Sequence, residues 1–450
     1  MTISENEDVV QQVSDIPPGR DSPGSGRSFK RVAFASFMGA LIEAFDFGLY
    51  GVAAALVFPK VFFPSLGGAA GTIASLATLG VAFIGRPLGA VIFGYFGDKF
   101  GRKATLVATV LGMGIGTALM GVLPTADMIG IAAPILLVLL RFLQGLAIGG
   151  EWAGAVLFAT EHAPPHRRGL YAMFPQLGGA FAVCLSAATL LVVGLFVDAQ
   201  TFIAWGWRVP FVCTLVLVVI ALYIRLKVEE TPVFVKDRKR TSPARAPLFD
   251  ALKNQPWTVL RAAGVALTTL AFVYTAQSFI ANYGVSHLGL SLNQVLGATA
   301  IAGLVYAVFT GISATLSDRL GRRAVIGGAN VAGVLWAFVL FPILNIGTIA
   351  AYGLALCFTM VIAGMVGGAL GAFLPEQFPT RYRYTAAGVS YQLTGIIGGG
   401  ITPLIAPVIV STYGSFTFGV VLAALCAVAA LCTFSLKNKA HDSMDWTLNE

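Results

Sequence analysis

Gly97-Asp98-Lys99-Phe100-Gly101-Arg102-Lys103 follows one long apolar run, and Ser317-Asp318-Arg319-Leu320-Gly321-Arg322-Arg323 follows another in the second half of the chain. A second pair of segments recurs in the same order. It consists of Glu161-His162-Ala163-Pro164-Pro165-His166-Arg167-Arg168 and Glu376-Gln377-Phe378-Pro379-Thr380-Arg381-Tyr382-Arg383. Two matched landmarks in matched order predict two related halves, and repeats of this parallel type commonly hold a binding site at their interface.

The residues between these landmarks are too apolar for a water-soluble protein. Hydrophobic residues make up 57% of the 450-residue chain and charged residues 11%, against roughly 45–50% and about 25% in globular proteins. Because a helix needs about 20 apolar residues to cross a bilayer, the length predicts an all-α integral membrane protein with roughly twelve transmembrane helices. The expected spans are 32–58, 72–96, 104–123, 131–159, 170–197, 209–226, 259–283, 295–316, 324–344, 348–374, 386–410 and 416–436.

The spans divide into two groups of six. We expect one six-helix half over 31–226 and a second over 257–436. Between them, 227–256 is rich in charge and proline, which is typical of a connector. Residues 1–30 lack an apolar core and are expected to form a disordered tail, and 437–450 are expected to form a tail at the other terminus.

The distribution of positive charge predicts the orientation. The net charge is +8, and 25 of the 29 Lys and Arg residues lie before the first span, after the last, around the connector or in the other even-numbered connections. Only Lys60 and Arg208 lie in the opposite connections. Because Lys and Arg are enriched on the cytoplasmic side of membrane proteins, we expect both tails and the connector in the cytoplasm and the helices in the inner (plasma) membrane. The partner of this basic chain is then the lipid bilayer rather than nucleic acid.

The sequence carries no enzyme signature. Its four histidines are scattered, its five cysteines lie within apolar runs without paired spacing, and no Gly-rich loop with Lys and Ser or Thr occurs. These observations disfavour a metal site, a redox motif and an ATP-binding loop. We therefore expect a protein without cofactor, metal or enzymatic activity that works as a monomer and draws on an ion gradient.

Two levels of family resemblance follow from these motifs. The segment from Gly94 to Lys103 resembles the loop signature of the major facilitator superfamily. A narrower resemblance is to the metabolite:proton symporter family, although Ala40, Ala44 and Phe45 depart from its usual pattern. The resemblance is carried by Gly39-Ala40-Leu41-Ile42-Glu43-Ala44-Phe45-Asp46-Phe47-Gly48-Leu49-Tyr50-Gly51, Arg86-Pro87-Leu88-Gly89, Arg141-Phe142-Leu143-Gln144-Gly145, Gly149-Gly150-Glu151 and Gly206-Trp207-Arg208-Val209-Pro210. It implies a small-molecule cargo such as a carboxylate, a zwitterion or an osmolyte.

Five charged residues lie within the expected spans: Glu43, Asp46, Arg86, Arg141 and Glu151. Each costs about 2.5–3.5 kcal/mol on insertion scales, so each is a candidate for function. Asp46 and Arg141 reach similar depth from opposite sides of the membrane. A desolvated acid near a guanidinium is able to load and release a proton, and the resemblance also implies an acid on the first helix with an Arg on the fourth. The alternative is a permanent structural ion pair.

The other three intramembrane charges have competing interpretations. Glu43 lies on nearly the same helical face as Asp46, so the two carboxylates are expected to titrate as a coupled pair, or Glu43 orients the fourth helix. Arg86 either docks an anionic substrate or pairs with Glu43 or Glu151. For Glu151 we favour a structural role.

Three sets of candidate residues result. Asp46, Glu43 and Arg141 form the proton-coupling set. The substrate site is expected to join charged groups of the first half with neutral groups of the second: Arg86, Arg141, Gln144, Tyr50, Gln277, Tyr391 and Gln392. The acids and bases that recur at helix ends predict a gate, with topology determination and helix capping as the alternative: Asp98, Arg102, Glu161, Arg168, Asp318, Arg322, Glu376 and Arg383.

These features favour a secondary active transporter that takes up a small polar organic metabolite together with a proton by alternating access. A proton-linked exporter of drugs or metabolites shares the fold, but it is expected to bury one isolated acid in a large apolar cavity. Sodium coupling stays open, because an acid with neighbouring carbonyls also binds sodium. Paired repeats and intramembrane charges argue against a receptor or scaffold.

Overall fold

The computed structural model describes residues 25–100, 102–149, 151–161, 163, 167–227, 247–379 and 382–439. Over these residues the chain is almost entirely helical. The first half contains α2 (Ser25–Leu56), α3 (Phe58–Val61), η1 (Pro64–Leu66), α4 (Gly68–Phe100), α5 (Arg102–Val122), α6 (Ala126–Ile129), α7 (Ala132–Ile148), α8 (Glu151–Glu161), α9 (Arg168–Phe196), α10 (Ala199–Thr201), η3 (Phe202–Gly206) and α11 (Arg208–Lys227).

The second half repeats the pattern of long helices after a short helix in the connector. Its elements are α13 (Pro247–Asn254), α14 (Pro256–Val265), α15 (Leu267–Thr275), η4 (Ala276–Ile280), α16 (Ala281–Ser286), α17 (Leu292–Leu320), α18 (Arg322–Leu344), α19 (Ile349–Glu376), α20 (Arg383–Thr394), η5 (Gly395–Ile401), α21 (Thr402–Tyr413) and α22 (Ser415–Ser435). The segments η4 and η5 are π-helical, a form that often marks functional sites.

The helices account for the twelve predicted spans. Within the described residues, ten helices are long and apolar enough to cross a membrane. The pair Ala199–Gly206 and Arg208–Tyr223, bent by 47°, provides an eleventh span. A shorter apolar helix, Val107–Val122 within α5, takes the remaining position, so the chain forms two groups of six.

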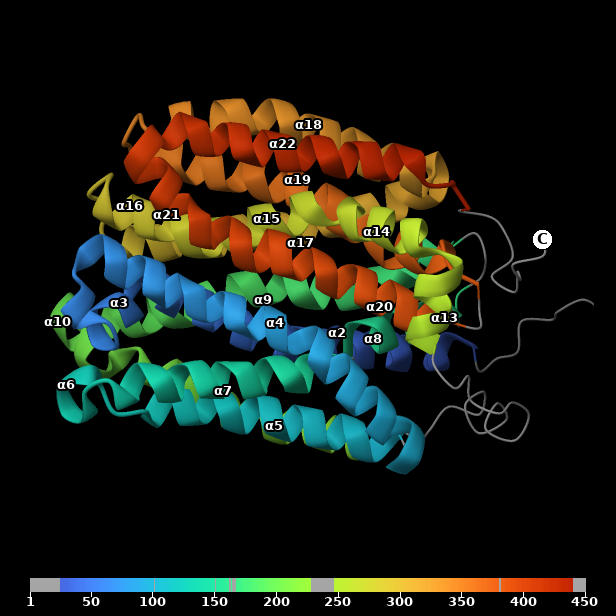
Figure 1. The fold of residues 1–450 in the computed structure, drawn as a ribbon, viewed down its shortest axis with the longest axis horizontal. Coiled ribbons are helices and arrows are strands. Elements are labelled where there is room, and N and C mark those ends of the chain that lie inside the picture. The colour runs from blue at the N-terminus through green and yellow to red at the C-terminus, as the bar shows by residue number, and fades with distance from the viewer. Residues whose placement is uncertain are drawn as a thin grey trace, which may run out of the picture.

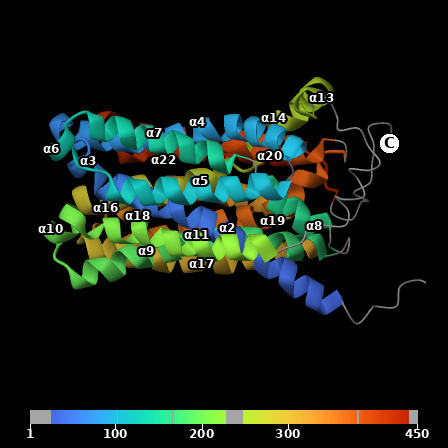
Figure 2. The ribbon, with the colours of Figure 1, turned by 90° about the horizontal axis from the view of Figure 1, so that it is seen from below.

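The long helices lie side by side along one axis of the molecule (Figures 1 and 2). Helix α9 packs along α2 within its own half and along α17 of the second half, and α17 packs in turn along α19. We call one end of the bundle the motif end, because α4 ends there at Phe100 and α17 ends there at Leu320, each within one of the repeated motifs. The short helices α3, α6, α10 and α16 lie at the opposite end (Figure 1).

Local sequence explains how α17 is bounded. At its start, the Ser291 side chain accepts a hydrogen bond from the Gln294 amide, and the Gln294 side chain accepts one from the Ser291 amide. This reciprocal cap satisfies backbone donors that a helix start leaves without partners. At its end, Gly321 adopts a φ of 87°, which favours glycine. Gly321 therefore ends one helix and lets Arg322 start the next.

The structure differs from the predicted boundaries in three ways. Helix α2 begins at Ser25, inside the tail expected over 1–30, and α13 forms within the expected connector. In the seventh and eleventh predicted spans, the π-helical segments η4 and η5 interrupt the α-helix. Hydropathy detects apolar length, but it does not detect breaks in the helical hydrogen-bond pattern, so these divisions were not predicted.

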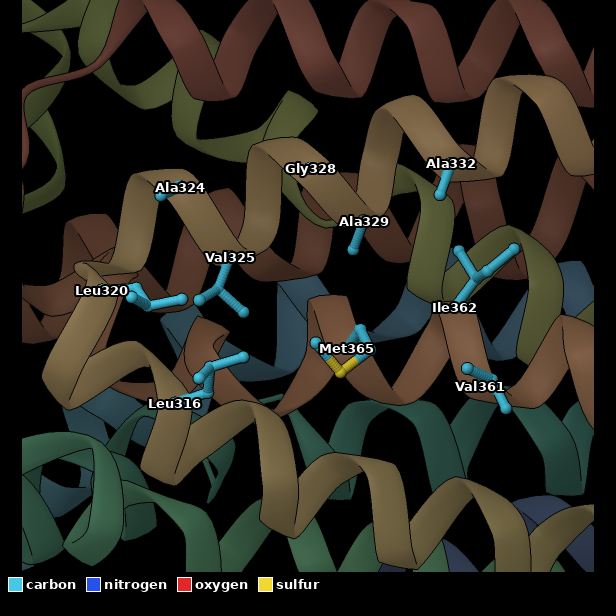
Figure 3. A pocket seen from close by; sticks show the side chains of 10 residues that line it. All are labelled: Leu316, Leu320, Ala324, Val325, Gly328, Ala329, Ala332, Val361, Ile362 and Met365. Carbon is cyan, nitrogen blue, oxygen red and sulfur yellow. The ribbon is translucent and has the colours of Figure 1, made fainter.

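The outer surface of the bundle is apolar, as a surface that faces lipid requires. Phe196 is 84% exposed and Ile131 79%, although both are large apolar side chains. Figure 3 shows a groove on this surface between α17, α18 and α19. It is lined by Leu316, Leu320, Ala324, Val325, Gly328, Ala329, Ala332, Val361, Ile362 and Met365. With no charged group in its lining, this groove is not a candidate site for a polar cargo.

Candidate functional site

Three helices of the first half bring four polar side chains into one hydrogen-bonded chain. Thr117 of α5 donates to Asp46 Oδ2 of α2 at 3.0 Å. Gln144 Nε2 of α7 donates to Thr117 Oγ1 at 2.6 Å, and Arg141 Nη1 donates to Gln144 Oε1. None of the four residues is more than 2% exposed. Two neutral side chains therefore connect a buried acid to a buried guanidinium.

The structure brings Asp46 and Arg141 into one site, as their similar depth predicted, but not into direct contact. No salt bridge within the described part of the chain joins them, although each acts electrostatically on the other. Thr117 and Gln144 connect them instead. The permanent ion pair left open by the sequence is therefore not formed in this conformation.

Aromatic rings surround the two guanidinium groups. The guanidinium carbons of Arg86 and Arg141 lie 4.0 Å and 3.9 Å from the ring centre of Phe47. Arg141 also lies 3.8 Å from the ring centre of Tyr50, and Arg86 lies 4.5 Å from that of Phe83. Such cation–π contacts offset part of the cost of removing a guanidinium from water. These contacts use the faces of each guanidinium, so the N–H donors at its edges remain for hydrogen bonds.

One edge of Arg141 has no partner. Nη1 donates to Gln144, whereas Nε and Nη2 make no hydrogen bond in this structure. These two atoms form the fork with which a guanidinium grips a carboxylate at two points. Nε of Arg86 is likewise buried without a partner. Because unpaired buried donors are costly, this part of the site is suited to an anionic ligand.

The second half presents neutral tyrosines to these charges. The ring of Tyr274, in α15, packs edge-on against Phe83 with centres 5.0 Å apart, and Phe83 in turn contacts the Arg86 guanidinium. Tyr306 of α17 lies 3.5 Å from the Thr269 hydroxyl of α15 through its own hydroxyl. The prediction that charge is concentrated in the first half, opposite uncharged groups of the second, agrees with this arrangement.

Two of the predicted substrate residues, Tyr391 and Gln392, contact α7 and α8 across the boundary between the halves. The Tyr391 ring stacks on Trp152 of α8 with centres 4.0 Å apart and an angle of 4°. Gln392 Nε2 donates to the carbonyl oxygen of Gly149 at 3.1 Å. In this conformation both residues hold the halves together, which sequence patterns did not predict.

The remaining predicted substrate residues have local partners. The Tyr50 hydroxyl shares a hydrogen bond of 2.5 Å with Thr78. Gln277, in the π-helical segment η4, has a 3.5 Å contact from Nε2 to Val273 O, and its buried Oε1 has no partner. Gln277 therefore retains an acceptor for a ligand, whereas the Tyr50 hydroxyl is already paired.

The intramembrane acids near Asp46 are only partly described. Glu43 is half-buried and acts electrostatically on Asp46, as expected for residues on neighbouring positions of one helical face. The side chain of Glu151 lies outside the described residues. Its predicted pairing with Arg86 and its structural role therefore stay predictions.

At the motif end, Asp318 joins the two halves. Its carboxylate accepts the backbone N–H of Gly169 at 2.9 Å and of Leu170 at 3.0 Å, at the start of α9. Asp318 also pairs with Arg322 at 2.7 Å, and Arg322 lies 3.5 Å from Glu376. An acid at a helix N-terminus is favoured by the helix dipole. The contact of Asp318 with the Gly169 and Leu170 amides therefore caps α9 and also links the two halves, as is expected of a gate.

Other members of the predicted gate have different partners or are not described. Arg383 donates from Nε to the carbonyl oxygens of Pro375 and Phe378, within its own half. Arg168 is buried and interacts electrostatically with Glu376. The side chains of Asp98, Arg102 and Glu161 lie outside the described residues, so the first-half cluster stays a prediction.

Several contacts at the site were missed by sequence reasoning. Thr117 links Asp46 to Gln144, and the Phe47 ring contacts both guanidiniums. A Thr in an apolar helix ordinarily bonds to its own backbone, so its sequence position carries no signal of a bond to another helix. Gln176 was also missed. It accepts a hydrogen bond from Trp152 within the first half and donates one to Gly367 O across the boundary between the halves.

Comparisons with known proteins identify transporters. The family model for Sugar (and other) transporter matches residues 32–259 and 256–445. The Inner membrane metabolite transport protein YhjE of Escherichia coli (strain K12) is 40% identical over 422 residues, covering 93% of this chain and 96% of that protein. The Shikimate transporter of the same strain is 37% identical, covering 91% and 94% of the two chains. The Proline/betaine transporter of that strain is 32% identical, covering 91% and 83%.

Solved structures share the fold. A D-xylose-proton symporter matches with a TM-score of 0.72 and 18% identity, covering 91% of this chain and 98% of that one. A partially occluded inward open conformation of the xylose transporter XylE from E. coli matches with a TM-score of 0.68 and 16% identity. Given the family match over both halves and relatives of 32–40% identity over most of their length, this chain is a multi-pass membrane transporter of the major facilitator superfamily, in the family described as Sugar (and other) transporter.

Proposed function

We propose that this chain is a proton-coupled symporter of the metabolite:proton type, which takes up a small organic carboxylate or zwitterion by alternating access. The observation that carries the proposal is the unpartnered Nε and Nη2 edge of Arg141. The remaining nitrogen of the same guanidinium, Nη1, is joined through Gln144 and Thr117 to the buried acid Asp46. An anion site and a proton site are therefore connected by hydrogen bonds.

Charge explains how the two sites are coupled. While Asp46 is ionised, its carboxylate attracts Arg141 and competes with a substrate carboxylate for it. Protonation of Asp46 removes this competitor, so the substrate binds the protonated protein more tightly. By linkage, bound substrate favours retention of the proton to the same degree. Release of one ligand then promotes release of the other.

Contacts between the halves support alternating access. At the motif end, Asp318 caps α9, and Gln176 Nε2 donates to Gly367 O at 2.8 Å. At the opposite end, Asn282 Nδ2 donates to Ala55 O at 2.8 Å. The halves thus meet on both sides of the site. Breaking either set of contacts would open the site toward one side of the membrane.

The names of the relatives favour a polar organic cargo. A Shikimate transporter and a Proline/betaine transporter are among the similar proteins, so carboxylate and zwitterion cargoes both occur among proteins of this similarity. Arg141 with a free fork fits the carboxylate that an organic acid and an amino acid share. We propose that the cargo contains at least one carboxylate.

The charge distribution of the chain supports an orientation with both termini in the cytoplasm, in the inner membrane. We propose that the transporter works as a monomer. Single cysteines at Ser242 in the connector and Ser286 at the opposite end test it in a Cys-free background. An impermeant thiol reagent on whole cells should label position 286 and leave position 242 unlabelled. The reverse pattern would invert the topology.

Transport in proteoliposomes tests the function. We expect an inward proton gradient to drive accumulation of one labelled compound from a panel of shikimate, simple carboxylates, proline and glycine betaine. A protonophore should abolish that accumulation. Accumulation driven by a sodium gradient alone would contradict proton coupling, and uptake only against the proton gradient would indicate an exporter.

A further inference from the structure

The hydroxyl of Thr117 has two acceptors and one hydrogen. Its Oγ1 lies 3.0 Å from Asp46 Oδ2 and 3.1 Å from the carbonyl oxygen of Met113, one turn earlier in α5. Its third neighbour, Gln144 Nε2 at 2.6 Å, only donates. Since a hydroxyl donates one hydrogen bond at a time and accepts two, Thr117 must choose between Asp46 and Met113.

The protonation state of Asp46 decides that choice. An ionised carboxylate has no hydrogen of its own, and a donor bond to a charged oxygen is stronger than one to a neutral carbonyl. The Thr117 hydrogen therefore points to Asp46 when the acid is charged. When Oδ2 carries a proton, the acid donates to Thr117 Oγ1, and the Thr117 hydrogen turns to Met113. Only one proton enters or leaves the site, and Thr117 keeps its own hydrogen throughout.

We infer that Thr117 is a positioning residue that transmits the protonation state of Asp46 to Arg141 by reversing its hydroxyl. The inference rests on the proposed proton coupling. With Asp46 charged, Arg141, Gln144 and Thr117 each donate toward the acid. Hydrogen bonds that all point the same way polarise and strengthen one another. After protonation, Thr117 accepts hydrogen bonds from both Gln144 and Asp46, so the bonds no longer all point toward the acid. Arg141 is then held less firmly toward Asp46, and its free edge is available to a carboxylate.

Other groups near Asp46 do not take over this task. The charged groups that act on it are Arg141 from α7 and Glu43 from its own helix. Arg86 of α4, Tyr50 of α2 and Tyr274 of α15 act on Arg141 instead. Among the described side chains, Thr117 is the one that donates a hydrogen bond to Asp46. Removing its hydroxyl therefore removes the link while the charges stay in place.

The test is the pH dependence of uptake by Thr117→Val in proteoliposomes. Valine keeps the shape but cannot donate, so the charged form of Asp46 loses its stabilising bond and retains its proton to higher pH. The external pH for half-maximal uptake should rise by about one unit. Thr117→Ser keeps the hydroxyl and should return the midpoint of the wild type.

Thr214→Val is the matched control. Thr214 is equally buried, in α11, and its hydroxyl donates to Phe211 O of its own helix at 2.6 Å. The external pH for half-maximal uptake by Thr214→Val should equal that of the wild type. If Thr117→Val reaches the membrane poorly, Thr117→Ala provides the same deletion with less bulk and should show the same upward shift.

The outcomes separate this inference from the proposed function. If uptake by the wild type has a clear pH midpoint and Thr117→Val and Thr117→Ala have the same midpoint, the role of Thr117 is overturned. Proton coupling stands in that case. A Thr117→Ser midpoint shifted as far as that of Thr117→Val would also overturn it, because packing and not the hydroxyl would then set the midpoint. A wild type whose uptake ignores pH would overturn the proposed function, and this inference with it.

Discussion

The two halves share a topology but differ in where they carry charge. In the first half, Asp46, Arg86 and Arg141 are buried within the membrane-spanning region. The second half faces them with tyrosines, and its buried ion pair of Arg322 and Glu376 lies at the motif end. The repeat thus preserved helix packing while the chemistry of the site diverged.

The asymmetry has a mechanical consequence. If the halves rock against each other, every contact across their boundary must break and reform. Breaking an ion pair in a low-dielectric interior leaves two buried charges without partners, which is costly. Stacked rings such as Trp152 and Tyr391 and single amide bonds such as Gln392 to Gly149 are cheaper to separate. Confining the mid-membrane charges to one half therefore allows motion of the other.

The largest expected effect comes from Asp46→Asn, which removes the buried acid of the first half. Asparagine keeps the size of the side chain but fixes it in a neutral state. With an imposed gradient of about two pH units, one proton per substrate supports about 100-fold accumulation, and the variant should reduce the ratio to about one. Exchange of labelled for unlabelled substrate needs no net proton release and should persist. Pronounced accumulation in the variant would remove Asp46 as the proton carrier and leave Glu43 as the next candidate.

A smaller effect is expected when the fork of Arg141 is replaced. Arg141→Lys keeps the positive charge but loses the two-point grip, so substrate affinity should fall roughly 10- to 100-fold, the value of one or two bonds to a charged group. Arg86→Lys should weaken binding less, because only Nε of Arg86 is buried without a partner. The affinities of the two variants are compared by measuring how substrate stabilises each purified protein against thermal unfolding. Equal losses would mean that the two arginines share the carboxylate.

Much of this architecture was predictable, because apolar length and positive charge are properties of the chain alone. The repeated motif predicted two halves, and the twelve spans and the superfamily are confirmed. Charged residues inside apolar runs predicted that Asp46 and Arg141 would share a site. Their cost in a membrane makes such residues conspicuous in any sequence.

The connections between these residues were not predictable. A Thr at position 117 has the same sequence signature whether it bonds to its own helix or to Asp46, and Thr117 does both. The stack of Trp152 on Tyr391 depends on how two distant helices meet, and no local pattern encodes this. The proton-coupling, substrate and gating roles of the predicted residues stay predictions that the variants address.

At the motif end, Asp318→Asn tests whether the two repeated motifs are equivalent. Loss of the charge weakens the bonds to the Gly169 and Leu170 amides, so the equilibrium between conformations should shift by about tenfold, with substrate affinity nearly unchanged. Net transport should slow accordingly. Asp98→Asn, at the matching position of the first half, should behave similarly if both motifs act as gates. An effect of Asp318→Asn on affinity but not on rate would count against gating.

The smallest expected effect concerns the stacked pair Trp152 and Tyr391, which joins the halves without charge. An aromatic pair contributes about 0.5–1.5 kcal/mol beyond its buried area, so Trp152→Leu should shift the conformational equilibrium only about threefold, toward the state open at the motif end. Tyr391→Leu should do the same, and the double variant should add little, because either change removes the whole stack. Accessibility of a cysteine introduced at Gly367, whose carbonyl oxygen is linked to Trp152 through Gln176, measures the opening. Two independent, additive effects would show that the rings act on other partners. A loss of affinity in Tyr391→Leu without any change in accessibility would return Tyr391 to the substrate site that its sequence position first suggested.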